Sequence, residues 1–226
     1  ADQVVAAADA DLKSIAPSFV EKCRSLAAAG SRRNALLMEE CASVLTALGP
    51  CATPLKGAWL LRHDIYPSKA RMFGDLDFAI DPGMRPREVV AAFRSLGYEY
   101  RSNSTPDHMA FQRVLPDMRL YDGLPALREP TADFEEHYAR IQRTFFAEAH
   151  YDIDARRSLR RRFFFGPEDR TDAARHLLLL AHHVCKHEFA HAIGMIDIAL
   201  LAASPTVDWG RLSDLCRRFG ALDICA

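Results

Sequence analysis

Hydrophobic and polar residues alternate most clearly in the segment Phe-Gly-Asp-Leu-Asp-Phe-Ala-Ile, which ends at Ile80. This alternation is typical of a strand, and it predicts that Leu76, Phe78 and Ile80 lie on a buried face. Asp75 and Asp77 then share the opposite face. Aspartate is a poor strand former and neighbouring like charges repel, so we expect a compensating positive charge beside this pair.

The patterns on either side of this strand divide the chain into three parts. Residues 1–49 have helical periodicity in two segments, and residues 167–226 are again helical, with helices predicted at 174–203 and 209–220. Residues 50–166 mix both patterns. Strands are predicted there at 51–56, 74–80, 98–102, 108–115 and 144–155, and helices at 57–66 and 85–97. The sequence therefore predicts an α/β (α+β) core between two helical regions.

The charge of the chain is balanced, with 29 Lys+Arg against 30 Asp+Glu, which argues against bulk attraction to nucleic acid or to an anionic membrane. At 226 residues and 49% hydrophobic composition, the chain is long enough to bury a full core. No apolar run reaches membrane-spanning length, and the N-terminal segment lacks the features of a signal peptide. The six cysteines form no CxxC pair. We expect a cytoplasmic protein with neither nucleic acid nor membrane as a partner.

A divalent cation is a natural partner for Asp75 and Asp77. Mg²⁺ prefers carboxylate oxygens, keeps several of its waters and often bridges to substrate phosphates. A strand face exposed to solvent is the alternative explanation of the same two residues. Upstream, the strand predicted at 51–56 leads into a helix at Gly57, where outward-facing N–H groups and a missing side chain would permit close approach of a phosphate.

The segment PLKGAWLLRHDIYPSKARMFGDLDFAI resembles the signature of a family of uncharacterised nucleotidyltransferases within the DNA polymerase beta-like nucleotidyltransferase superfamily. The matching elements are Leu-Lys-Gly, then Tyr-Pro, then Arg, then Asp-Leu-Asp. The later segments HVCKH, MIDIALL and VDWGRL are similar to the helical C-terminal half of that family, so the resemblance extends from Arg32 over nearly the whole chain. It implies a small mixed-sheet core and transfer of a nucleotidyl group from a nucleoside triphosphate, with ATP as the expected donor. The acceptor, whether small molecule, peptide or protein, is not identified by the sequence.

The resemblance also implies catalysis by two Mg²⁺ ions that three carboxylates hold. Asp75 and Asp77 would be two of these ligands. The alternating segment His-Tyr-Asp-Ile-Asp-Ala offers Asp152 and Asp154 for the third position. By analogy with the acidic strand of the family we expect Asp152, with Asp154 or Asp122 as substitutes. One ion would activate an attacking hydroxyl and the other would neutralise the departing pyrophosphate.

Four further residues are expected to contact the nucleotide. Gly57 would lie at the phosphate, but Ala58 follows it where the superfamily usually has a serine, so one phosphate contact is missing. Lys56 offers a cation in compensation. Arg71 would contact a phosphate or pair with Asp75, or alternatively form a structural ion pair. The missing serine also makes a nucleotide-binding protein without catalytic activity an alternative on the same fold.

A second motif predicts a different activity. The segment HEFAHAIGMID matches His-Glu-x-x-His followed by Gly and Asp, as in zinc metallopeptidases. In that interpretation His187 and His191 bind zinc, Glu188 acts as the base and Asp197 completes the site. Such enzymes need the helix to end at the glycine, whereas the apolar pattern predicts a helix that continues through Gly194. The nucleotidyltransferase interpretation is therefore favoured.

Overall fold

The computed structural model describes residues 17–66, 71, 73–105, 108–114, 144–150, 169–187, 189 and 192–221. Its strands are β1 (Ala52–Pro54), β2 (Asp75–Ile80), β3 (Glu99–Thr105), β4 (His108–Val114) and β5 (Thr144–His150). Its helices are α2 (Pro17–Leu48), α3 (Lys56–Arg62), α4 (Pro86–Ser95), α6 (Ala173–Lys186), α7 (Ala192–Ala202) and α8 (Trp209–Phe219), and a short 3₁₀ helix (Gly49–Cys51) precedes β1. None of the described helices has the length and apolar character that a membrane span requires.

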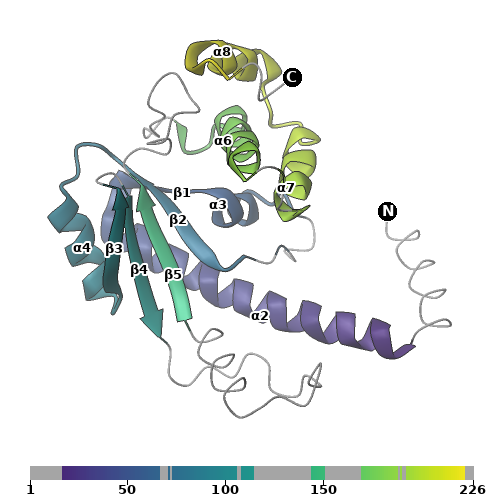
Figure 1. Ribbon diagram of the computed structural model, residues 1–226, viewed down its shortest axis with the longest axis horizontal. Helices are drawn as coiled ribbons and strands as arrows, with labels where there is room; N and C mark the ends of the chain where they lie inside the picture. Colours follow the sequence, from purple (N-terminus) through teal and green to yellow (C-terminus); the bar gives the residue numbers. More distant parts are fainter. Residues whose placement is uncertain are drawn as a thin grey trace.

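The strands form one mixed sheet in the order β1-β2-β5-β4-β3 (Figure 1). β2 and β5 pair in parallel, whereas β1 with β2, β4 with β5 and β3 with β4 pair antiparallel. The predicted α/β class and mixed sheet are confirmed. The parallel pairing brings Asp77 of β2 directly beside Glu148 of β5.

Helices cover both faces of the sheet. On one face, Leu76, Phe78 and Ile80 are almost completely buried against α2 and α4, which confirms the predicted strand pattern. On the other face, α3, α6, α7 and α8 share a second core that includes Trp59 and reaches Ala79 of β2. Figure 1 shows α6, α7 and α8 gathered at one end of the sheet, while the long helix α2 extends well past the sheet.

The prediction of one continuous helix at 174–203 is wrong. α6 ends at Lys186 and α7 begins at Ala192, and between them Phe189 has a φ of 59°, which no right-handed helix can contain. The two helices pack together, and a Cβ on Gly194 would lie 2.5 Å from Cγ2 of Val184. Local periodicity does not reveal this turn, because both helices are rich in apolar residues. At the N-terminal end, the described residues form one helix from Pro17 instead of two segments.

Candidate active site

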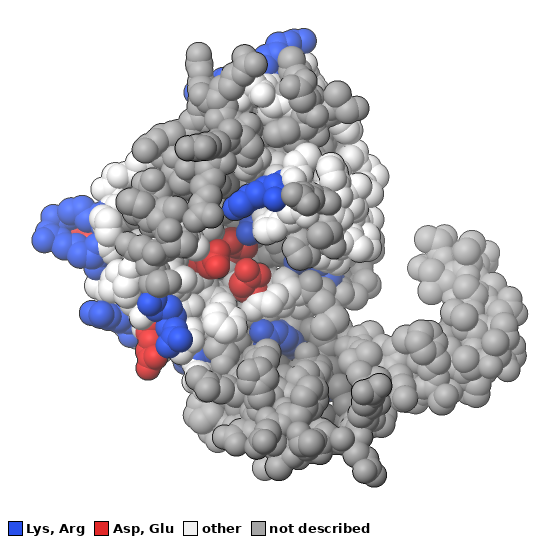
Figure 2. All heavy atoms as spheres, viewed as in Figure 1, with Lys and Arg blue, Asp and Glu red and all other residues white. Residues whose placement is uncertain are grey.

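The candidate site lies on the sheet face that carries Asp75 and Asp77. The neighbouring strand β5 presents Glu148 and His150 beside them, and β4 presents His108 beside His150. Figure 2 shows acidic atoms gathered near the centre of one face of the molecule, with basic atoms close by. The sheet therefore brings together ionisable groups from three strands.

Asp77 is a buried carboxylate with two cationic neighbours. Its side chain is 3% exposed, and its Oδ1 accepts hydrogen bonds from Lys56 Nζ at 2.9 Å and from His150 Nε2 at 3.1 Å. Burial raises the pKa of Asp77, but the charges and hydrogen bonds of Lys56 and His150 outweigh it and hold the pKa below its ordinary value. Asp77 is therefore ionised.

The backbone around Lys56 places its side chain at Asp77. Lys56 opens α3 with a φ of 48°, a left-handed conformation that costs a non-glycine residue roughly 1–2 kcal/mol. The preceding residue, Leu55, donates its N–H to the carbonyl of Asp77 at 2.8 Å. Burial lowers the pKa of Lys56 but the attraction of Asp77 prevails and the net shift is upward, so the ammonium stays charged. The strain is consistent with a functional position.

Asp75 differs from Asp77 in its electrostatics. Part of its side chain is exposed, yet neighbouring atoms displace enough water to raise its pKa, and the negative charge of Asp77 raises it further, to about 6. Lys56 opposes this shift without cancelling it. Of the predicted pair, Asp75 is therefore the carboxylate that a cation would stabilise most.

Glu148 is a third carboxylate at the site. It is the register partner of Asp77, and its Oε2 lies 3.1 Å from His108 Nε2 and 3.5 Å from His150 Nε2. The proximity of these two histidines lowers the pKa of Glu148 to about 2. Burial lowers the pKa of His150, but its bonds to Asp77 and Glu148 raise it by more.

Sequence reasoning missed Glu148 and both histidines. It placed the third acid at Asp152, with Asp154 and Asp122 as substitutes, and all three lie outside the described residues. A signal was present, because alternation in β5 puts Glu148 on the polar face while Phe145, Ala147 and Ala149 are buried.

Arg71 forms a structural ion pair. Its Nε donates to Asp197 Oδ1 at 2.7 Å and its Nη2 to Oδ2 at 2.6 Å, and the hydroxyl of Tyr66 also donates to Oδ1. This pairing joins the segment before β2 to α7. The structure contains the structural ion pair given as an alternative for Arg71, with Asp197 and not Asp75 as its partner, and a phosphate contact by Arg71 stays a prediction.

The reason for glycine at position 57 is also visible. A Cβ on Gly57 would lie 2.9 Å from Arg71 Cζ and closer still to Nη1, so the guanidinium group occupies the space of a side chain. Ala58 is 1% exposed and packs within the core. Phosphate binding by Lys56, Gly57 and Ala58 stays a prediction.

The zinc-peptidase motif does not form one helical face. His187 follows the last residue of α6, and the left-handed Phe189 interrupts the motif after it. Glu188 and His191 lie outside the described residues. Asp197 is 1% exposed and bound by Arg71. As predicted, α7 continues through Gly194.

Comparison with known protein families gives one match. The family described as "Uncharacterised nucleotidyltransferase" matches residues 5–226. No curated protein and no solved structure matches the chain. The match includes every residue of the charged site on β2, β4 and β5.

Proposed function

The chain belongs to the uncharacterised nucleotidyltransferase family, and we propose that it transfers a nucleotidyl group from a nucleoside triphosphate to an acceptor in a reaction that requires Mg²⁺. ATP is the first donor to test. The acceptor is a nucleophile, such as a hydroxyl group, on a small molecule, a peptide or a protein.

The observation that supports this function best is the convergence of three carboxylates from two parallel strands. Asp75 and Asp77 lie on one face of β2, and Glu148 lies beside Asp77 on β5. Three carboxylates face two described cations, Lys56 and His150, so negative charge remains in excess. A hard oxygen donor set with excess negative charge fits Mg²⁺.

Asp75, Asp77 and Glu148 are the residues that would hold the metal. A bound Mg²⁺ would neutralise charge on the triphosphate and lower the pKa of the attacking hydroxyl. Lys56 and His150 neutralise Asp77 before the metal arrives. With a metal to neutralise Asp77, the ammonium of Lys56 would be available to contact phosphate oxygens, which is the role expected from the sequence.

The test is incubation of the chain with each α-labelled nucleoside triphosphate and Mg²⁺, followed by mass analysis of the protein and of candidate acceptors. Asp77→Asn and Glu148→Gln should each reduce transfer by more than the roughly 10–100-fold seen when a residue that only supports a metal ligand is lost. Asp214→Asn is the matched control, because Asp214 is exposed on α8 and pairs only locally with Arg217.

Two outcomes would change the proposal. If Asp152→Asn abolishes transfer and Glu148→Gln does not, the third ligand belongs to the segment that follows β5. If nucleotide binds in a Mg²⁺-dependent manner but no transfer occurs with any acceptor, the chain is a nucleotide-binding protein on this fold. The peptidase alternative is not proposed, because its motif is divided by a turn.

A further inference from the structure

We propose that His108, Glu148 and His150 form a binding site for a divalent transition-metal ion, with Zn²⁺ as the first candidate. This site is separate in its donor chemistry from the carboxylate site that the proposed function needs. Mg²⁺ prefers oxygen ligands, whereas two imidazoles and one carboxylate are a donor set that suits zinc and other first-row transition metals.

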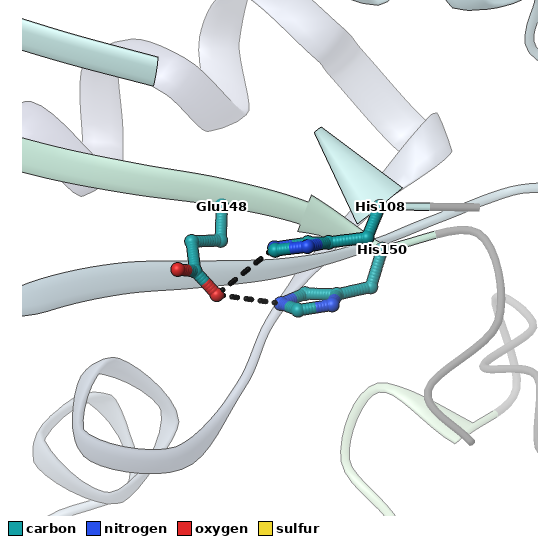
Figure 3. Close-up of side chains that lie close together, drawn as sticks. All are labelled: His108, Glu148 and His150. Carbon is teal, nitrogen blue, oxygen red and sulfur yellow. Dashed lines mark ion pairs between the residues drawn. The ribbon is translucent and has the colours of Figure 1, made fainter. Parts of the chain in front are cut away.

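The sheet positions these three residues beside one another. His108 on β4 and His150 on β5 are register partners, and Glu148 precedes His150 by two positions on the same face. Figure 3 shows the two imidazole rings stacked, with the carboxylate of Glu148 directed toward both of them. The side chain of His108 is 19% exposed, that of Glu148 33% and that of His150 16%, so an ion from solvent can reach them.

The two distances to Glu148 are close to those of a metal site. One ligand atom from each residue lies within 4.8 Å of the others, and Glu148 Oε2 is 3.1 Å from His108 Nε2 and 3.5 Å from His150 Nε2. In a tetrahedral zinc site with bonds of about 2.0–2.2 Å, two ligand atoms are separated by roughly 3.3–3.6 Å. The pairs with Glu148 therefore need to move by only a few tenths of an ångström.

The histidine rings must rotate to admit the ion. Their centroids are 4.6 Å apart and their planes differ by 12°, whereas a bound metal lies close to the plane of each ring. The torsion involved, χ2 of histidine, is broad and soft, so rotation is inexpensive. Three protein ligands leave a fourth tetrahedral position for water, as in zinc sites that exchange or react.

The position of Glu148 gives this site a regulatory consequence, which rests on the proposed function. Glu148 neighbours both Asp77 and the two histidines. A transition metal on His108 and His150 would hold the Glu148 carboxylate and so withdraw it from Mg²⁺. Zinc at this site is therefore an inhibitor of nucleotidyl transfer.

The direct experiment titrates the metal-free full chain with Co²⁺, followed by its visible absorption, and with Zn²⁺, followed by calorimetry. We expect one ion per chain with the absorption of four-coordinate Co²⁺. His108→Gln should weaken binding at least about 100-fold, since one of three protein ligands is lost. His187→Gln is the matched control, because it removes a histidine of the competing peptidase motif, and it should bind as the unmodified chain does.

Two results would overturn the site. One is unchanged Co²⁺ affinity in His108→Gln. The other is loss of binding in His187→Gln, which would assign the ion to the peptidase motif. X-ray absorption of the zinc-loaded unmodified chain adds a measurement that does not depend on the folding of a variant, and it should count two imidazole ligands. A count of none would refute the proposal.

The binding measurements do not require enzymatic activity, so the two proposals can fail independently. If transfer is absent but one Co²⁺ binds through His108, the metal site stands and the proposed function fails. If transfer occurs, Zn²⁺ should inhibit it. In His108→Gln, the Zn²⁺ concentration that halves the zinc-free activity of the variant should be about 100-fold higher than the corresponding concentration for the unmodified chain. Transfer that saturating Zn²⁺ leaves unaffected would refute the regulatory consequence.

Discussion

Gly57→Ala tests why glycine stands at the start of α3. The two explanations differ in what they predict for the protein without nucleotide. If glycine serves only the approach of a phosphate, alanine should leave stability unchanged or raise it. If glycine instead makes room for the guanidinium of Arg71, alanine should destabilise the fold. The structure favours the second explanation, since a Cβ would lie 2.9 Å from Arg71 Cζ and 3.0 Å from Phe73 Cγ.

The magnitude follows from the ion pair that the new methyl group would disturb. Arg71 is 8% exposed and its partner Asp197 is 1% exposed, and separating such a buried pair costs about 3–5 kcal/mol. Alanine contributes up to about 1 kcal/mol over glycine within a helix. The net expectation is a loss of about 2–4 kcal/mol in the free energy of unfolding.

The assay is urea unfolding of the nucleotide-free chain, with Gly210→Ala as control. Gly210 is the second residue of α8, as Gly57 is the second residue of α3, but it is exposed. The control should change stability by less than about 1 kcal/mol. In an Arg71→Ala background the clash with Arg71 is absent and only the close contact with Phe73 remains, so Gly57→Ala should cost clearly less than it does in the unmodified chain. Equal stability of Gly57→Ala and the unmodified chain, with nucleotide affinity alone reduced, would refute this account of Gly57.

Three further predictions concern stability without metal. Asp75→Asn should stabilise the chain at pH 7, because it removes the carboxylate with the raised pKa. Asp77→Asn should instead cost about 1–3 kcal/mol by weakening hydrogen bonds from charged groups. Urea unfolding of both variants measures this difference, and stabilisation by both would contradict it. Burial lowers the pKa of His183 to about 3, so the unfolded chain takes up a proton first and stability falls as pH drops from 6.5 toward 3. His183→Gln should therefore lose less stability than the unmodified chain between pH 7 and pH 5. An equal drop in melting temperature for both proteins over this pH range would argue against it. Gly194→Ala should cost about 1–3 kcal/mol by overlap with Val184, and this cost should be smaller in a Val184→Ala background. A double variant that loses the sum of the two single losses would contradict this.

The sequence was sufficient wherever a structural feature depends on neighbours along the chain. The alternation around Asp75 and Asp77 predicted a strand and its buried face, because side-chain direction in a strand follows directly from sequence position. The segment from β1 into α3 was also predicted, although α3 ends at Arg62, before the predicted end at residue 66. These features need no knowledge of which strands pair.

The sequence was insufficient where distant segments meet. Local spacing suggested a role for Asp197 only in the disfavoured zinc motif, whereas its partner Arg71 lies 126 positions away. Glu148 was overlooked because its importance comes from the parallel pairing of β5 with β2, which alternation within β5 does not specify. The same holds for His108, whose neighbours come from another strand.

The charges around Asp77 explain how the site can be stable without a metal and still accept one. An unpaired carboxylate that is 3% exposed would cost several kcal/mol, and Lys56 and His150 remove that cost by hydrogen bonding to it. Together they carry the same charge as one divalent ion when His150 is protonated, so a metal can replace them with little change in the net charge. His150 also contacts Glu148 within the proposed transition-metal site. Under the two proposals, Mg²⁺ and zinc would compete for Glu148. They would also place opposite demands on His150, which would leave Asp77 when Mg²⁺ binds but stay beside Glu148 as a neutral ligand when zinc binds.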